Sequence, residues 1–258
     1  MRAYRAGFAG GFWRTMANPE DLATRSGFVA IILLVQSSLW RSAIASQGGA
    51  IDGYTLPALL WYVFAAQTSV GALRPRMIEE VGDEIGSGAV AIAMLRPTSV
   101  AGLRMSIEYG EVCARMIWLI LLGGIVMLLV IGAPPSWLAL MLAVPAMLLA
   151  SLANVAMQHA IGGVAFWLLD AKSGWFLFQK VVFLPGGMLI PLEMLPGAVG
   201  TVCKGLPFAA MAYIPGRLAA GNADVGLIVV QLMWVAILVP LALGVFALGE
   251  RRLGAVGG

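Results

Sequence analysis

The stretch EEVGDEIGSGAVAIAMLRP, residues 79–97, places four acidic side chains and three glycines between two long apolar runs. Charged residues make up 11% of the chain, yet eleven of the 29 lie between Arg74 and Arg115. An apolar chain that gathers its charge in one internal loop is expected to contact something in water there. The side of the membrane on which this loop lies is therefore the main question of the topology.

The composition predicts an all-α polytopic membrane protein. Hydrophobic residues account for 60% of the chain, against roughly 45–50% in soluble domains. The mean hydropathy is +0.92, and several apolar runs reach the roughly 20 residues that a membrane helix needs. The net charge is +3, but the arginines flank the apolar runs, which indicates membrane topology and not nucleic-acid binding.

Six transmembrane helices are predicted within a single transmembrane domain, residues 1–258. The expected segments are Ser26–Ile44, Leu56–Leu73, Cys113–Ile131, Trp137 through Met157 towards Phe166, a broken segment from Trp175, and Val225–Leu248. An even number of spans places both termini on the same side of the membrane.

The N-terminal residues 1–25 are predicted to form an interfacial helix. Tyr4, Phe8 and Phe12 lie four residues apart, so a helix would present them on one stripe. Arginines are scattered around this helix, so its amphipathicity is only fair, but the aromatic stripe favours a position on the inner leaflet. The alternative is a solvated tail.

Lys and Arg residues near the span ends predict the orientation. Twelve of them fall on the side of the termini and the 74–112 loop, and three fall on the other side. The excess of positive charge marks the cytoplasmic side. We therefore expect a multi-pass inner-membrane protein whose termini and 74–112 loop are cytoplasmic.

Residues 183–220 are predicted to be a broken, re-entrant segment. Five of the 13 prolines, Pro185 through Pro215, fall within 31 residues of mostly apolar sequence. Proline removes a backbone donor, and unpaired backbone groups are not tolerated in lipid. Short helices that enter the outer half of the membrane and turn back fit this pattern. The alternative is an extracellular loop with apolar patches.

The sequence lacks the motifs that would indicate catalysis by this chain alone. The G-x-x-x-x-G-K-[ST] phosphate loop is missing from the sequence, and His159 is the single histidine. The acids Glu79, Glu80, Asp83 and Glu84 could bind a divalent ion, but a solvated or partner-facing surface is the commoner outcome. No cofactor, metal site or catalytic residue is therefore predicted in this chain.

The 79–97 stretch itself predicts two short helices. A charged helix ends where Gly86 and Gly88 break it, a short apolar helix covers Ala89–Leu95, and Arg96–Pro97 stops it. Such a crosswise helix could insert into a groove on a soluble partner and transmit its movement to two spans. The alternative is a loop that lies on lipid.

These features resemble a permease of the ABC-type-2 transporter family over nearly the whole chain. The resemblance rests on D-E-I-G-S-G at Asp83–Gly88, L-R-P at Leu95–Pro97, and L-P-F…P…G across Leu206–Gly221. It implies a dimer with a second permease, the same or homologous, and two cytoplasmic ATP-binding subunits that hold ATP and Mg²⁺. It also implies a coupling helix, and the residues matched to it are Glu79, Glu80, Asp83, Glu84, Ile85, Gly86, Gly88, Leu95, Arg96 and Pro97.

The family is mostly associated with export of drugs, lipids, glycans or peptides. The resemblance therefore implies a permease subunit of an ATP-driven exporter, in contact with membrane lipids and catalysing no reaction itself. Polar residues inside the predicted spans are candidates for the translocation path. They are Gln36, Gln67, His159, Lys180 and Glu193.

Several alternatives stay open at this point. Lys180 could extend its side chain to the interface, and His159 could be an interhelical hydrogen-bond partner instead of a proton relay. A membrane-embedded lipid-modifying enzyme with metal at the acidic cluster, and a proton-coupled transporter using His159 and Lys180, are the rival functions.

Overall fold

The computed structural model describes residues 1–74, 76–95, 98–168 and 172–256. Within these residues helices make up the regular structure, apart from one isolated bridge between Ile51 and Tyr54. The elements in chain order are α1 (Arg2–Met16), α2 (Pro19–Ser46), α3 (Leu56–Gly71), α4 (Met77–Gly86), α5 (Ala89–Ala93), α6 (Val100–Val130), α7 (Trp137–Gly163), η1 (Val164–Phe166), α8 (Lys172–Phe183), η2 (Leu192–Met194), α9 (Ala198–Lys204), η3 (Ala209–Met211), α10 (Tyr213–Ala219) and α11 (Val225–Val256).

Among the described residues, four helices are long and apolar enough to cross a membrane, namely α2, α6, α7 continued by η1, and α11. The chain is therefore an all-α membrane protein. The other two predicted spans are short, because α3 has 16 residues and α8 has 12. At 1.5 Å per residue α3 is about 24 Å long, less than the roughly 30 Å thickness of a hydrocarbon core.

Polar caps explain where three of the long helices begin. The Asn18 side chain accepts from the backbone N–H of Asp21 at the start of α2, where proline occupies the first helical position. Ser99 and Ser136 accept in the same way from residues three further on and begin α6 and α7. Each cap satisfies a backbone donor that the helix leaves without a partner.

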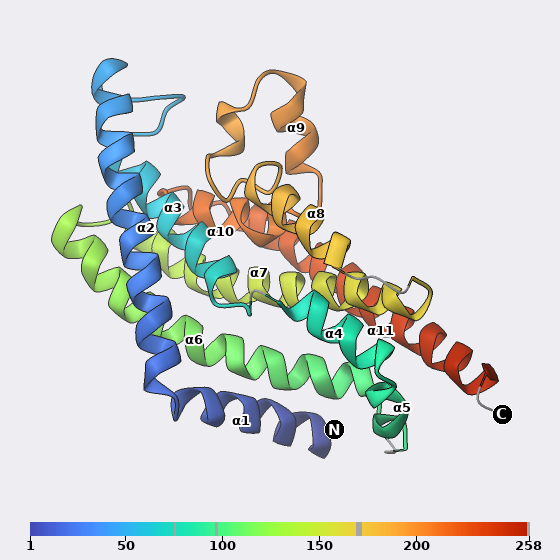
Figure 1. The fold of residues 1–258 in the computed structure, drawn as a ribbon. Helices are drawn as coiled ribbons and strands as arrows, with labels where there is room; N and C mark the ends of the chain where they lie inside the picture. The colour runs from blue at the N-terminus through green and yellow to red at the C-terminus, as the bar shows by residue number, and fades with distance from the viewer. Residues whose placement is uncertain (75, 96–97, 169–171, 257–258) are drawn as a thin grey trace.

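α3 is the centre of the bundle. All of its residues from Ala58 to Ser69 are buried, and α2, α6, α7 and α10 pack around it. α11 lies along α7 on the outer side of the bundle (Figure 1). Both termini and α5 lie towards one end of the molecule, and α9 and the end of α2 lie towards the other (Figure 1).

α1 packs lengthwise on the first half of α6 (Figure 1). The predicted aromatic stripe faces this helix, since the Phe8 ring lies 6.1 Å from that of Tyr109 and 6.4 Å from that of Phe12. The aromatic face of α1 is thus used in part for packing within the protein, and Trp13 remains exposed.

α6 begins at Val100, thirteen residues before the predicted start of the third span at Cys113. The prediction was wrong because Arg104, Glu108 and Glu111 were assigned to a loop on account of their charge. In the structure they are helical, and Glu108 and Glu111 are buried. Their charges are compensated by ion pairs, which are described below.

The 79–97 stretch contains two short helices with a break between them. α4 ends at Gly86, and Gly88 has a φ of 76°, a conformation that glycine adopts without strain. α5 then covers Ala89–Ala93, and the predicted stop at residues 96–97 lies outside the described residues. α4 packs on α7 with Ile78 and Val81 buried.

Candidate functional site

Ten charged side chains form one connected set of ion pairs at the end of the bundle that carries α4. We call this set the ion network. It joins α1, α2, the link after α3, α4 and α6. Its members are Arg14, Asp21, Arg25, Arg74, Glu80, Glu84, Arg104, Glu108, Glu111 and Arg115. Five are basic and five acidic, so the network is electrically balanced.

Glu111 on α6 is the most connected member. Its carboxylate pairs with Arg14 of α1, with Arg74 at 3.3 Å and with Arg115 at 3.2 Å, while its side chain is only 3% exposed. Removing a buried charge from its partners is costly, because it leaves the other charges uncompensated. Glu111 therefore holds α1 and the end of α3 against α6.

Glu108, one turn earlier on α6, extends the network towards α4 and α7. It pairs with Arg74 at 3.2 Å and with Arg104 at 3.3 Å, and its second oxygen lies 3.5 Å from Nε2 of His159. Arg74 and Arg104 also pair with Glu80 and Glu84 of α4. Two arginines thus connect the charged face of α4 to buried carboxylates of α6.

Arg74 stays charged in this setting. Burial would lower its pKa, but the carboxylates of Glu108 and Glu111 raise it, and the net shift of the pKa is upward.

Asp21 completes the network on α2, where it pairs with Arg25 at 2.9 Å and with Arg115 at 3.1 Å. α2 and α4 are therefore linked through the same charges.

The residues matched to the coupling helix divide into three groups. Glu80 and Glu84 pair within the ion network, and Glu79 lies 3.6 Å from Arg76. Asp83, Gly86, Gly88 and Leu95 are exposed, and Ile85 is buried. Arg96 and Pro97 lie outside the described residues. The stretch thus has an inward charged face and an outward tip, where Ile92 is 73% and Leu95 is 85% exposed.

A cavity of about 650 Å³ lies beside the network between α2, α3, α7 and α8. Its walls are mostly apolar and include the aromatic rings of Phe28, Trp175, Phe178 and Phe183. Asp21, Arg25 and Arg74 of the network border it. The other polar side chains in its walls are one threonine and five carboxamides. The carboxamides belong to Gln36, Gln67, Asn154, Gln158 and Gln179.

The structure brings together two of the five residues predicted for the path. Gln36 and Gln67 line the cavity. His159 is fully buried, and its Nδ1 donates to the carbonyl of Val155 at 2.9 Å. Lys180 is exposed, with its Nζ 5.1 Å from the centre of the Phe176 ring.

Asn154 is a cavity residue that the sequence predictions missed. The signal for it was its spacing of four residues from Gln158 on an otherwise apolar helix. This spacing places both carboxamides on the same face of α7, and that face is a wall of the cavity.

Glu193 belongs to a different site, in the broken segment. Its carboxylate accepts from the hydroxyls of Tyr54 at 3.1 Å and Tyr213 at 2.5 Å, and it pairs with Lys204 at 3.0 Å. Arg217 donates to Tyr54 and lies 3.8 Å from Glu193. Glu193 therefore joins η2, α9 and α10 to the turn before α3, which is a structural role.

Acid is expected to loosen this site through Glu193. Burial would raise its pKa, but bonds from Tyr213 and Lys204 lower it, and the net shift of the pKa is downward from 4.5. Its stabilising effect is thus present above pH 4.5 and is lost as the pH falls below that value. We expect about 1 kcal/mol of local stability to be lost progressively as the pH falls below 4.5, and Glu193→Gln to remove this pH dependence.

The measurement is the rate at which a pyridyl disulfide, which reacts with thiols in acid, modifies the buried Cys203 of α9. Cys113 is replaced by serine so that one thiol reports. Glu20→Gln, an exposed site on α2, serves as the matched control and should keep the wild-type pH profile. An unaltered profile in Glu193→Gln would contradict the assignment.

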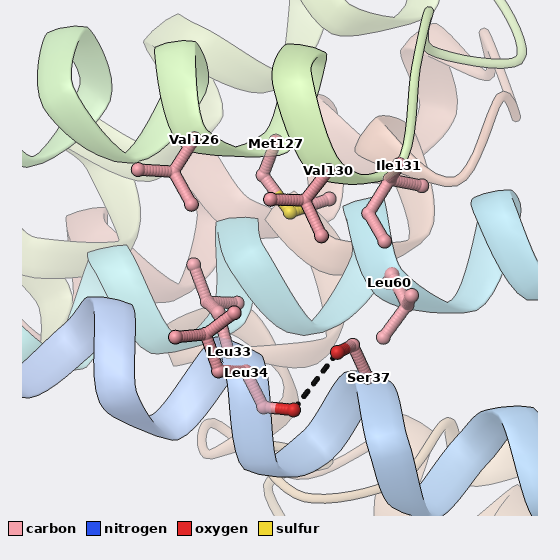
Figure 2. A pocket seen from close by; sticks show the side chains of 8 residues that line it. All are labelled: Leu33, Leu34, Ser37, Leu60, Val126, Met127, Val130 and Ile131. Carbon is pink, nitrogen blue, oxygen red and sulfur yellow. Dashed lines mark hydrogen bonds between the residues drawn. The ribbon is translucent and has the colours of Figure 1, made fainter.

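A second, much smaller crevice of about 10 Å³ lies between α2, α3 and α6 (Figure 2). Its lining is apolar except for Ser37, whose hydroxyl donates to the carbonyl of Leu34 at 2.8 Å (Figure 2). A space of this size holds about one water molecule. It is a packing gap, and the large cavity is the candidate binding site.

A helical membrane bundle with a mostly apolar cavity that carries several carboxamides, next to an ion-pair network, is an arrangement suited to a transport protein. Comparison with protein families matches residues 31–257 to the ABC-2 family transporter proteins. This match covers most of the chain, so the chain belongs to the ABC-2 transporter family and is a transmembrane permease of the ABC type. The family implies association with an ATP-binding subunit. Comparison with curated proteins gave no match.

Proposed function

We propose that this chain is the permease subunit of an ATP-driven exporter. It works with a second permease and with two cytoplasmic ATPase subunits, which supply the ATP and Mg²⁺ chemistry. The observation that carries the proposal is the ion network, because it connects α4 to the helices that wall the cavity.

The proposed topology has six passages through the inner membrane, with both termini cytoplasmic. The excess of Lys and Arg near the termini and α4 supports this orientation. α3 and α8 are the two short passages, and their ends are completed by the turn at Ile51–Tyr54 and by the broken segment. In that segment η2, α9, η3 and α10 are the short helices of the re-entrant unit.

Coupling proceeds from the exposed tip to the cavity. An ATPase subunit holds Ile92 and Leu95 in a groove and displaces α4 when it closes on ATP. Arg74 and Arg104 carry this displacement to Glu108 and Glu111, because each arginine pairs with both α4 and α6. Asp21 and Arg115 extend it to α2, whose movement against α8 changes the opening of the cavity.

The apolar tip gives the most direct test. Replacing Ile92 and Leu95 with aspartate should abolish co-purification of an ATP-binding protein from the native host, since a charged side chain cannot enter an apolar groove without a partner. The expected loss is at least tenfold in recovered ATPase subunit, equal to about 1.4 kcal/mol. Val202→Asp, an exposed apolar site on α9 at the far end, is the matched control and should bind normally.

Recovered partners are identified by mass spectrometry, and a protein with a phosphate loop is expected. A chain that purifies without such a protein, and that alone modifies a lipid in the presence of Mg²⁺, would support the enzyme alternative and overturn the proposal. Transport by the chain alone in vesicles, driven by a pH gradient without ATP, would support the proton-coupled alternative.

A further inference from the structure

One turn of α7 presents an unusual pair of carboxamides to the cavity. Gln158 Nε2 donates to Asn154 Oδ1 at 2.9 Å. This bond leaves Nδ2 of Asn154 and Oε1 of Gln158 without a partner among the described residues, although both side chains are at least 98% buried. Buried polar groups are normally satisfied, so these two atoms are an unsatisfied donor and an unsatisfied acceptor on the helix that forms one wall of the cavity.

The two atoms require opposite partners. An amide nitrogen donates and an amide oxygen accepts, and turning both amides over would again leave one donor and one acceptor. A ligand hydroxyl or amide can accept from Asn154 and donate to Gln158 at the same time. A carboxylate or sulfate can only accept hydrogen bonds, so it would repel Oε1 of Gln158, which is also an acceptor. An ammonium can only donate, so it would repel the N–H groups of Asn154 Nδ2.

The charges at the border of the cavity favour the same kind of ligand. Arg25 is already engaged by Asp21 at 2.9 Å and by the Leu73 carbonyl at 2.9 Å, and Arg74 is engaged by three glutamates. With five basic and five acidic members, the network offers no surplus charge to an ion. Burying an unpaired ion is far more costly than burying a neutral polar group.

The remaining walls accept an apolar body. The rings of Phe28, Trp175 and Phe178 line the cavity together with aliphatic side chains. A volume of about 650 Å³ falls within the roughly 300–1,000 Å³ of small-molecule sites. Gln67 on α3 supplies a further carboxamide to the same cavity.

We infer that the cavity binds an uncharged amphiphile, in which an apolar body carries hydroxyl or amide groups that pair with Asn154 and Gln158. The inference rests on the proposed function in that it names the class of molecule carried. Binding itself is a property of this chain and needs no ATPase subunit, so the two can be tested apart.

The experiment uses the full chain in lipid nanodiscs and three photoreactive probes that share one diazirine-bearing alkyl chain. Their head groups are β-glucoside, sulfate and primary ammonium. Labelled peptides are identified by mass spectrometry over a concentration series. We expect saturable labelling of α7 and α8 by the glucoside, with half-saturation at a concentration roughly tenfold lower than for either charged probe.

Two variants test the named pair. Asn154→Leu and Gln158→Leu should each raise the half-saturating glucoside concentration roughly tenfold and leave the charged probes little changed. The matched control Gln47→Leu, at an exposed glutamine beyond α2, should bind as the wild type does.

The probe comparison on the unaltered chain decides the inference even if a variant fails to fold. Equal binding of all three head groups, tighter binding of a charged one, or glucoside labelling outside the cavity would overturn it. Those results would leave the permease proposal standing, whereas absence of an ATPase partner would overturn that proposal and leave glucoside binding intact.

Discussion

Replacing Glu111 with glutamine is expected to lower the free energy of unfolding by roughly 3–5 kcal/mol. The variant keeps the size of the side chain but removes a carboxylate that pairs with Arg14, Arg74 and Arg115. The three guanidiniums would then face each other across a site where the Glu111 side chain is 3% exposed. Breaking a buried ion pair from one side is costly because the remaining charge keeps its desolvation penalty.

Removing the charge of Glu111 should destabilise the protein much more than removing that of its partner Arg14. Arg14 is 68% exposed, and without it Glu111 retains two arginines. Arg14→Gln is therefore expected to cost about 1 kcal/mol or less, as exposed pairs do. Glu79→Gln, which affects the exposed pair with Arg76, is a second control with the same change of chemistry.

Thermal unfolding in nanodiscs can be followed by a thiol-reactive dye, because Cys113 lies two residues after Glu111 and is half-buried. The wild-type chain and the Arg14 and Glu79 variants should expose Cys113 at similar temperatures, and Glu111→Gln at a clearly lower one. If all four chains unfold together, Glu111 is not the centre of the network.

The sequence allowed the helices to be predicted better than the ion network. Long apolar runs and the glycine break before α5 are local signals, and local signals predict where helices begin and end. The start of α6 was missed because a search for apolar runs leaves out charged residues, and the first turns of this helix carry several. A signal was present, since Arg104 and Glu108, and likewise Glu111 and Arg115, lie four residues apart and pair along the helix.

The cavity could be predicted only in part, for a physical reason. Glutamine in an apolar span is costly, so Gln36 and Gln67 stood out in the sequence. Whether such residues meet depends on how each helix is rotated about its axis, and that is decided by packing. His159 and Gln158 are neighbours in sequence, yet one faces Glu108 and the other faces the cavity.

Alanine at Gly110 or at Gly11 is expected to separate α1 from α6. A Cβ at Gly110 would lie 2.1 Å from the carbonyl oxygen of Phe8, and one at Gly11 would lie 2.1 Å from that of Ile107. Both obstacles are backbone atoms, which cannot move aside as the end of a side chain can. We expect each substitution to cost about 3 kcal/mol, the upper end of overpacking effects.

The same two helices provide matched controls. A Cβ added at Gly10 or at Gly124 would have no atom within 4 Å, so alanine there meets open space. Alanine favours a helix over glycine by about 1 kcal/mol, and these controls should be neutral or stabilising. Hydrogen exchange of α1 distinguishes the cases, because the Gly11 and Gly110 variants should lose protection along α1 and the controls should keep it.

The double variant Gly11→Ala with Gly110→Ala gives the sharpest result. The two glycines serve one contact, so the first alanine already displaces α1 and the second has little left to disrupt. The combined loss should therefore be well below the sum of the single losses. Displacement of α1 also removes Arg14 from Glu111, so adding Arg14→Gln to Gly110→Ala should cost nothing more. Fully additive losses, or α1 protection equal to that of the Gly124 variant, would show that α1 does not depend on this close approach.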